Sequence, residues 1–267
     1  MPMTKIQIGH VSLSRMILGG NPFSGFSHQS AAKDDQMRHY YTTDRIKQAL
    51  KLAEQAEINT HIGRADHHIM RVLMEYWDEG GHIQWLAQTC PEIGSPSRGV
   101  DNAIRGGASG CFLHGGMMDK LLADGDLAEV PVAIEKIKQA GLISGIAGHN
   151  PKVFEWAEAN LDVDFYMCSY YNPSKRNDQG EMLPDQPEYF GDDDREMMVD
   201  LIQHLSKPVI HYKVFAAGRK DPAEALAFVA RHLRSHDAVC IGVYLKEQPE
   251  SVTENVHLLE QALARTA

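Results

Sequence analysis

Three neighbouring side chains in this sequence are suited to proton chemistry. His211, Tyr212 and Lys213 lie inside one short apolar run, residues 207–219, which breaks at Ala-Ala-Gly. The run shows no alternation of polar and apolar residues, so we predict a strand that is buried on both faces. Titratable groups at the end of a buried strand are costly unless they are hydrogen-bonded or used. The trio is therefore the first candidate for a functional site.

Each residue of this run has more than one chemical role open to it. Neighbouring residues of a strand point to opposite faces, so His211 and Lys213 should share a side and Tyr212 should face the other, unless the strand end bends. We predict His211 as an acid/base group, and Lys213 as a catalytic base or as the partner of an anion. Arg219 and the small-residue turn before it are typical either of a phosphate site or of a plain tight turn.

Polar residues also follow the other predicted strands. The active site of a parallel barrel lies at the carboxyl ends of its strands, so these residues are site candidates. His114 is predicted to act in acid/base catalysis. The predicted substrate-binding residues are Asn21, Arg64, Asp66, Gln88, Asn150, Tyr212 and Arg219.

Four histidines are expected near this rim, and neutral imidazole is a good ligand for zinc and similar divalent ions. The candidate metal ligands are His61, His114, His149 and His211. The sequence contains no H-x-H or H-E-x-x-H spacing. A second interpretation therefore stays open, in which buried histidines satisfy backbone groups.

A strand–loop–helix unit recurs along the chain and positions these side chains. The predicted strands are Arg15–Gly20, Ile58–Gly63, Ile83–Thr89, Gly110–His114, Leu142–Ala147, Asp164–Ser169, the run 207–219 and Ala238–Tyr244. Apolar residues at helical spacing follow each strand. We predict an α/β fold, a single-domain (β/α)8 TIM barrel over residues 1–267, in preference to an open doubly wound sheet.

An N-terminal hairpin and two long loops are expected to complete this barrel. Residues 1–14 show the pattern of a β-hairpin. The polar segments 21–41 and 172–192 are too long for plain connectors and are typical of lids. We expect these lid-like loops to exclude water and to set specificity.

The composition argues against several classes of protein. A formal net charge of −10 without a basic run argues against nucleic acid and against an anionic membrane surface as partners. The four cysteines form no C-x-x-C pair, and no segment has the pattern of a signal peptide or a membrane span. We expect a soluble, cytoplasmic protein with a small-molecule partner, and assembly into a homo-oligomer stays open.

Several motifs, in one order along the chain, resemble those of the aldo-keto reductases. They are Leu18-Gly19-Gly20-Asn21 after the hairpin, Gly145–Asn150, Tyr170-Tyr171-Asn172, Pro208–Gly218, and the segment from Gly242 to Asn255. The resemblance implies the same barrel, with Tyr212 where that family stacks a tyrosine on nicotinamide. It also implies that Lys246 and Asn255 bind the cofactor, with Asn255 at its adenosine phosphate, if NAD(P)H binds.

The Asp-Tyr-Lys-His tetrad of that family is mostly missing. His114 matches the histidine of the tetrad, but Gln88 stands at the lysine position, and residues 58–64 supply neither the aspartate nor the tyrosine. Ala147-Gly148 stands where serine and asparagine would hold the nicotinamide carboxamide. Loss of the general acid costs a carbonyl reduction about 10²–10⁴ in rate. The resemblance therefore predicts the fold more firmly than the reaction.

Three hypotheses follow. The leading one is an enzyme that acts on a small polar, sugar-like carbonyl or hydroxyl compound by acid/base isomerisation, epimerisation, elimination or hydrolysis, with a divalent metal as an optional cofactor and NADP less favoured. The second is an NAD(P)H-dependent reductase with a rebuilt proton relay, for instance His114 with Tyr40 or Tyr41. The third is a non-catalytic binding subunit. Cofactor binding separates the first two, and retention of ligand binding without turnover marks the third.

Overall fold

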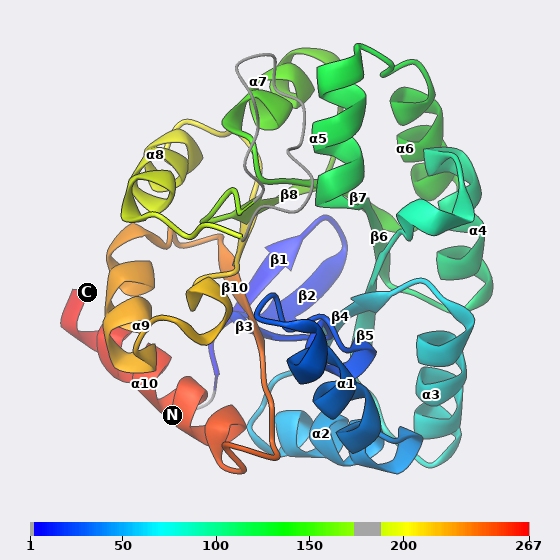
Figure 1. Cartoon of the computed structure of the whole chain (residues 1–267). Helices are drawn as coiled ribbons and strands as arrows, with labels where there is room; N and C mark the ends of the chain where they lie inside the picture. Colours follow the sequence, from blue (N-terminus) through cyan, green and yellow to red (C-terminus); the bar gives the residue numbers. More distant parts are fainter. Residues whose placement is uncertain (1–2, 174–187, 267) are drawn as a thin grey trace.

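Eight parallel strands close into a barrel in the computed structural model, which describes residues 3–173 and 188–266 (Figure 1). The strands follow the chain order around the barrel, and the last pairs with the first to close it. They are β3 (Met16–Gly19), β4 (Thr60–Arg64), β5 (Gln84–Gln88), β6 (Gly110–Leu113), β7 (Ile143–Gly148), β8 (Phe165–Ser169), β9 (Val209–Tyr212) and β10 (Ala238–Gly242). The predicted (β/α)8 barrel is confirmed.

Helices cover the outside of the barrel (Figure 1). They are α1 (Ala31–Tyr40), α2 (Thr43–Gln55), α3 (His67–Asp78), α4 (Pro96–Arg105), α5 (Gly115–Asp124), α6 (Glu129–Gln139), α7 (Pro151–Asn160), α8 (Asp192–Ile202), α9 (Pro222–His232) and α10 (Ser251–Thr266). Thr42 and Asp221 cap α2 and α9, because their side chains accept hydrogen bonds from backbone amides of the first turn. Across the described parts of the chain, no helix is both long and apolar enough to cross a membrane.

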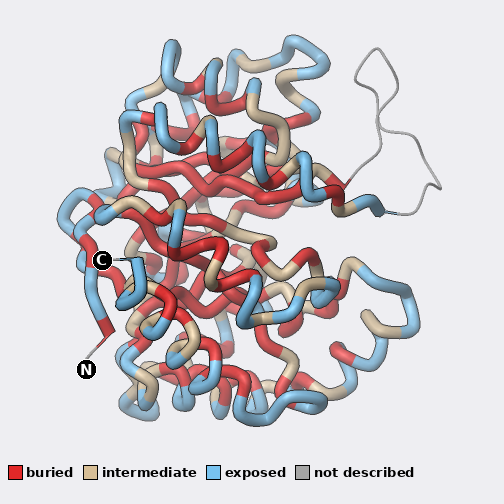
Figure 2. Tube along the Cα trace, turned by 90° about the vertical axis from the view of Figure 1, so that its left-hand side faces the viewer, coloured by how far each residue is buried: buried red, intermediate tan, exposed pale blue. Residues whose placement is uncertain are grey.

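Two apolar cores stabilise this architecture. One fills the barrel lumen, where inward-facing residues such as Ile62 and Phe112 stack on the hairpin β1 (Lys5–Ile8) and β2 (Val11–Ser14). The other lies between the strands and the helices. In Figure 2 the buried segments of the chain trace accordingly run through the interior of the molecule. Full burial of one such side chain contributes about 1.5–3 kcal/mol. The predicted hairpin is confirmed, and it closes the amino-terminal end of the lumen.

The segments between the strands differ from the predictions in two places. Residues 21–41 are not an irregular loop, because they contain a 3₁₀ turn, η1 (Pro22–Ser24), and the helix α1, which Ser30 caps. The helix α5 follows β6 directly and comes before α6, so two helices stand between β6 and β7. The second lid-like loop, 172–192, falls mostly outside the described residues. Regular helices therefore surround more of the barrel mouth than the sequence predicts.

Candidate active site

The carboxyl end of β9 bends, and this bend decides where its polar side chains point. His211 is fully buried on the outer side of the barrel wall, whereas Tyr212 packs against the lumen core. Lys213 has a φ of 57°, in the left-handed region, where a non-glycine residue costs about 1–2 kcal/mol. This turn breaks the alternation of the strand, so Lys213 lines the same cavity as Tyr212. The prediction that His211 and Lys213 share a side is wrong.

Tyr212 is the end of a hydrogen-bonded chain that runs through His149 to Asp119. The Tyr212 hydroxyl lies 3.2 Å from Nε2 of His149, and Nδ1 of His149 lies 2.7 Å from Oδ2 of Asp119. The other carboxylate oxygen accepts the backbone amides of His149 and Asn150, both at 3.1 Å. Asp119 thereby orients the imidazole, with the Nδ1 proton toward the carboxylate and the Nε2 lone pair toward Tyr212.

A small residue at the start of α5 makes room for this chain. Asp119 lies on α5, directly after β6, while His149 follows β7. A Cβ on Gly115 would lie 2.9 Å from the Tyr212 hydroxyl and 3.1 Å from the His149 ring. Any larger residue at position 115 would therefore push the phenol and the imidazole apart.

Burial and hydrogen bonding set the charge states of Tyr212, His149 and Asp119. It lowers the pKa of His149, against the opposing effect of Asp119, so the imidazole is neutral at pH 7. Burial by itself would raise the pKa of Asp119, but hydrogen bonds from His149 and from the Asn150 amide keep that pKa below its usual value. Burial raises the pKa of Tyr212 well above its usual value. Phenol, neutral imidazole and carboxylate together form a general base that can pass a proton inward.

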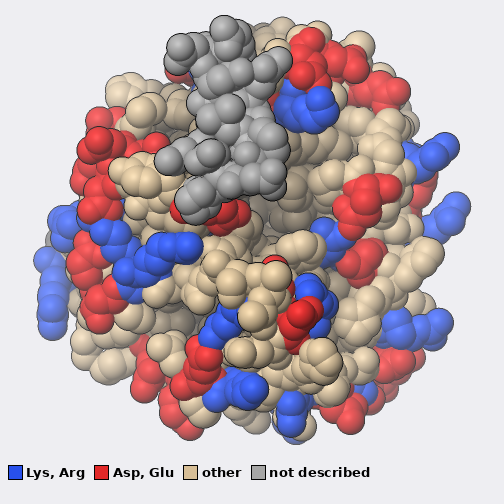
Figure 3. Space-filling model, in the orientation of Figure 1, with Lys and Arg blue, Asp and Glu red and all other residues tan. Residues whose placement is uncertain are grey.

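Tyr212 forms part of the wall of a cavity of about 290 Å³, which we call the mouth cavity. Its lining extends from the barrel lumen to the start of α10. It includes Ile62, Gln88, Met167, Tyr212, Lys213, Tyr244, Ser251 and Asn255. Acidic and basic side chains are interspersed over this face of the molecule (Figure 3). The cavity thus joins the proton chain to the far rim of the barrel mouth.

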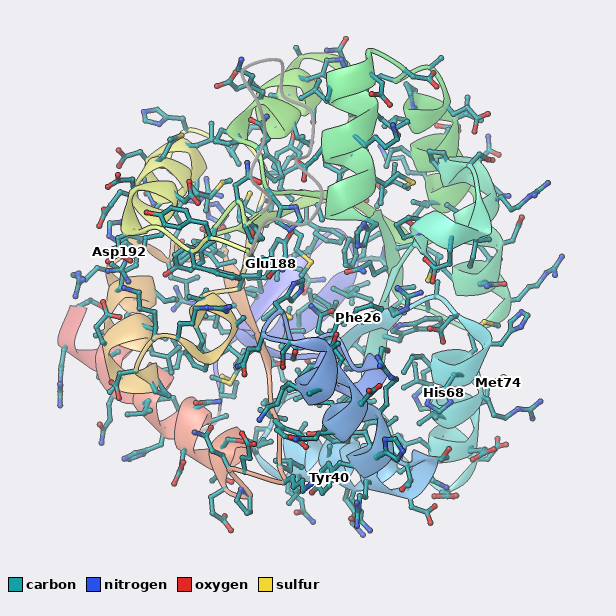
Figure 4. The ribbon with its side chains drawn as sticks, in the orientation of Figure 1. Phe26, Tyr40, His68, Met74, Glu188 and Asp192 are labelled. Atoms are coloured by element: carbon teal, nitrogen blue, oxygen red, sulfur yellow. The ribbon has the colours of Figure 1, made fainter. Side chains whose placement is uncertain are left out.

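Lys213 connects two segments across the mouth. Its Nζ lies 2.9 Å from Nε2 of His28, and Nδ1 of His28 lies 2.8 Å from a carboxylate oxygen of Glu188. Glu188 and Phe26, from distant parts of the chain, both lie near the centre of the view into the barrel (Figure 4). Burial lowers the pKa of Lys213 to about 8. The charge of this lysine therefore changes close to physiological pH.

A second cavity, of about 340 Å³, lies at the starts of α9 and α10, and we call it the helix-end cavity. Asp221, Glu250 and Glu254 line it, and among the residues that the structure describes no lysine, arginine or histidine does. Ser251 and Asn255 are buried and line both cavities. The two cavities therefore adjoin at the first turn of α10, and we refer to them together as the groove.

Five of the predicted site residues line the mouth cavity: Asn21, Gln88, Tyr212, Lys213 and Asn255. Lys246, the other predicted cofactor contact, is exposed and lines neither cavity. The remaining predicted residues lie around the rim or behind the barrel wall.

Arg219 and the turn before it use their hydrogen-bond donors within the protein. The Arg219 guanidinium donates to the carbonyl oxygens of Ala216 and His28. The backbone amides of Gly218, Arg219 and Lys220 all donate to the carbonyl of Phe215. Because these amides are already used, the geometry favours the tight turn over the phosphate site. A contact between Arg219 and substrate stays a prediction.

Four more predicted residues have structural partners at the rim. Arg64 pairs with Asp66 at 3.0 Å, and Asp66 caps α3. Asn150 caps α7, and His114 caps α5 through its Nδ1. Burial, with a smaller effect of the His149 charge, lowers the pKa of His114 to about 4. Substrate contact by the first three and acid/base action by His114 stay predictions.

The four histidines predicted as metal ligands do not converge. Nδ1 of His61 bonds the Leu18 carbonyl at 3.0 Å, and His211 bonds Asp237 and Tyr170 outside the lumen. Within residues 3–173 and 188–266, no group of three or more His, Cys, Asp or Glu side chains is placed to hold a metal ion. The four histidines therefore form no shared metal site among these residues, and the structure gives the predicted metal no support. His211 is buried and does not line the mouth cavity, and its catalytic role stays a prediction.

The proton relay predicted from His114 with Tyr40 or Tyr41 does not form either. The Tyr41 hydroxyl donates to the Val243 carbonyl at 2.7 Å, and the Tyr40 ring packs edge-on against Tyr41 and Tyr244. Both tyrosines therefore belong to the packing between α1 and the segment after β10.

Sequence reasoning missed Asp119 and His28. Asp119 is the one carboxylate in Met117–Leu122, five residues after His114 and beside Lys120, among four apolar residues, and this placement is a weak signal that the sequence carries. His28 has no comparable signal, because its contact with Lys213 depends on the tertiary fold of the first long segment.

Comparisons with known proteins identify the fold and no closer relationship. No family model matches the sequence, and a search of curated proteins finds no match. PA4992 from Pseudomonas aeruginosa, named as an aldo-keto reductase, is similar with a TM-score of 0.65 at 16% identity, over 97% of this chain and 96% of that one. The holo form of aldo-keto reductase AKR11C1 from Bacillus halodurans gives 0.61 at 15% identity, over 99% and 96%.

A variant of Gox0644 in complex with NADPH gives a TM-score of 0.59 at 13% identity, over 100% of this chain and 94% of that one. At such low identity these likenesses establish the fold alone. The predicted resemblance is confirmed at that level: the chain has the (β/α)8 barrel fold of these aldo-keto reductase structures.

Proposed function

We propose that this chain is a nicotinamide-dependent oxidoreductase that interconverts a small polar alcohol and its carbonyl form. Tyr212 exchanges the proton with the substrate oxygen. The observation that supports this most directly is that Tyr212 lines the mouth cavity and that its hydroxyl contacts His149, which Asp119 orients. The proposal differs from our leading sequence hypothesis, because the proton chain offers the general acid that the missing tetrad does not.

Tyr212, His149 and Asp119 can transfer a proton away from the substrate in oxidation and toward it in reduction. In oxidation, the Tyr212 oxygen accepts the proton of the substrate hydroxyl while its own proton passes to Nε2 of His149, and Asp119 stabilises the imidazolium. In reduction, Tyr212 donates a proton to the developing alkoxide. The raised pKa of Tyr212 favours a coupled shift of both protons over a free phenolate. A bound nicotinamide supplies or accepts the hydride.

The groove has features that fit a dinucleotide. Tyr212 and Asn255, which line one cavity, are the positions where the resemblance implies the nicotinamide and the adenosine phosphate. The buried hydroxyls of Tyr244 and Ser251 have no hydrogen-bond partner among the described residues, which costs about 1–3 kcal/mol each until a ligand satisfies them. Lys33 and Lys213 also line the mouth cavity and supply positive charge for a diphosphate.

The lumen end of the mouth cavity favours a compact substrate. Gln88 offers an amide, while Ile62 and Met167 close the floor with apolar surface. A small polar compound with a carbonyl or hydroxyl group beside Tyr212 satisfies both features. A sugar-like compound fits this description.

Nicotinamide-dependent turnover tests the proposal. The purified chain is incubated with NAD⁺ or NADP⁺ and a panel of small polyols and hydroxy acids, and the fluorescence of the reduced nicotinamide is followed. We expect substrate-dependent reduction of at least one nucleotide. If neither nucleotide binds and neither is reduced, the proposal is wrong.

A second candidate is acid/base isomerisation or elimination without nicotinamide. One observation favours it: Ala147 and Gly148, at the end of β7, offer no polar side chain to hold a carboxamide. Tyr212 and Lys213 would then carry out proton transfer alone. NMR in D₂O separates the candidates, because exchange of deuterium next to a substrate carbonyl without added nucleotide supports the second.

A further inference from the structure

We propose that the helix-end cavity selects a dinucleotide whose adenosine ribose carries free hydroxyls, so that this chain uses NAD(H) in preference to NADP(H). The inference rests on the proposed function above, because it concerns the far end of the same groove. The two nucleotides differ by one phosphate group on the adenosine ribose. The charges that line that end therefore decide between them.

The two parts of the groove differ in charge. Lys33 and Lys213 line the mouth cavity, where Glu247 pairs with Lys33. The helix-end cavity is lined by Asp221, Glu250 and Glu254, and by no cation from the described parts of the chain. A diphosphate is attracted in the first part, whereas a further phosphate in the second would face three carboxylates. This distribution suits a ligand that is anionic in its middle and uncharged at its far end.

Polar groups at the junction of the two cavities point to a ligand with hydroxyl groups. Ser251 is 4% exposed, and its buried hydroxyl has no partner among the residues that the structure describes. Ser251, Glu254 and Asn255 are spaced i, i+3 and i+4, so they share one face of α10. A carboxylate accepts hydrogen bonds from the hydroxyls of a ribose diol. An ionised phosphate in place of one hydroxyl donates no such hydrogen bond. Ser251 and Asn255 add a hydroxyl and an amide to this set.

Two features that would favour a phosphate do not dominate here. The amino-terminal end of α10 carries a positive partial charge, but Glu250 and Glu254 lie within or beside its first turn and offset it. Lys246, the nearest lysine in the preceding segment, is exposed and lines neither cavity. The carboxylates therefore set the charge of this end.

Titration of the full chain with NADH and with NADPH, followed by nicotinamide fluorescence, tests the inference. We expect NADH to bind about tenfold more tightly than NADPH, because of repulsion between the phosphate and the carboxylates. Added salt should narrow this difference, since it screens exposed charges. NADPH binding as tight as NADH binding would overturn the inference and leave the proposed function standing. Binding of neither nucleotide would overturn both.

A charge reversal at Glu254 tests whether the helix-end cavity sets the preference for NADH over NADPH. Glu254→Lys is expected to improve the Kd for NADPH relative to that for NADH by about tenfold. The matched control is Glu260→Lys, which changes the same charge on the same helix but lines neither cavity. The control should leave the ratio of the two Kd values unchanged. If Glu254→Lys and Glu260→Lys shift the ratio equally, or if neither shifts it, the assignment to this cavity is wrong.

Discussion

Two Tyr–His–Asp chains lie on opposite sides of β9, and they differ in what they can reach. The inner chain consists of Tyr212, His149 and Asp119. The outer chain consists of Tyr170, His211 and Asp237, with the Tyr170 hydroxyl 3.0 Å from Nδ1 of His211 and Nε2 of His211 3.3 Å from Asp237. The inner tyrosine lines the mouth cavity, whereas every member of the outer chain is buried behind the barrel wall.

The environment of the outer chain explains why it is structural. Asp237 also accepts hydrogen bonds from the Val209 amide and from the Arg234 guanidinium, so it fastens the start of β9 to the segment before β10. Asp119 instead fixes the ring of an imidazole whose other nitrogen faces Tyr212. His211 and Tyr212 are neighbours in sequence, and strand alternation alone sends one to each chain. Identical residue types thus acquire different roles from the side of the strand on which they lie.

Replacement of each imidazole in turn should give the largest difference between the two Tyr–His–Asp chains. His149→Ala is expected to lower kcat by about 10²–10⁴, and it should also lower the free energy of unfolding, because the buried Asp119 loses its imidazole partner. His211→Ala should leave kcat near the wild-type value and lower the free energy of unfolding by about 3–5 kcal/mol, because Asp237 loses a buried partner. Turnover assays and urea denaturation of both variants check this. A large loss of kcat in His211→Ala with unchanged stability would contradict the assignment.

The carboxylates should give the next largest contrast. Asp119→Asn is expected to lower kcat by about 10²-fold or more, because the imidazole loses the partner that fixes its tautomer. The Asp119 charge raises the pKa of His149, so its loss should also move the acidic limb of the kcat profile to lower pH. Asp237→Asn should affect stability instead. A pH profile of kcat for both variants measures the difference, and a profile that moves only in Asp237→Asn would refute it.

Acid should weaken the outer chain in a measurable way. Burial by itself would raise the pKa of Asp237, but hydrogen bonds from His211 and Arg234 lower it to about 2 from a usual value of 3.8. Because the folded-state pKa is depressed, this stabilisation is complete above pH 3.8 and is lost as the pH falls toward 2. The difference corresponds to about 2 kcal/mol of unfolding free energy. Denaturation between pH 5 and pH 2 should show this slope in the wild type and a shallower one in Asp237→Asn.

The smallest expected effect concerns Lys213, beside the inner chain. Burial lowers its pKa to about 8, so the lysine is a cation below that pH and neutral above it. The affinity for an anionic dinucleotide should therefore fall by about threefold to tenfold as the pH rises through 8. Lys213→Gln should bind more weakly and lose this pH dependence. An unchanged pH dependence in the variant would show that another group is responsible.

Local patterns in the sequence predict the fold better than the site. Buried apolar runs predict the strands, and residues such as Asp221 mark helix starts, because both depend on neighbours in the chain. Tyr212 and Lys213 are also predicted as site residues, since polar groups at a strand end are conspicuous. Their pairing with Asp119 and His28 is not predictable in the same way. It depends on the bend at Lys213, on the extra helix α5, and on contacts between segments far apart in the sequence.

The most direct test removes one oxygen atom from each chain. Tyr212→Phe and Tyr170→Phe keep the aromatic ring, so the two variants differ mainly in which hydroxyl is lost. We predict that Tyr212→Phe lowers kcat by about 10²–10⁴ with little change in stability, and that Tyr170→Phe retains kcat and loses about 1 kcal/mol of unfolding free energy. Equal kcat values in the two variants would contradict the central claim that Tyr212, through His149 and Asp119, exchanges the substrate proton.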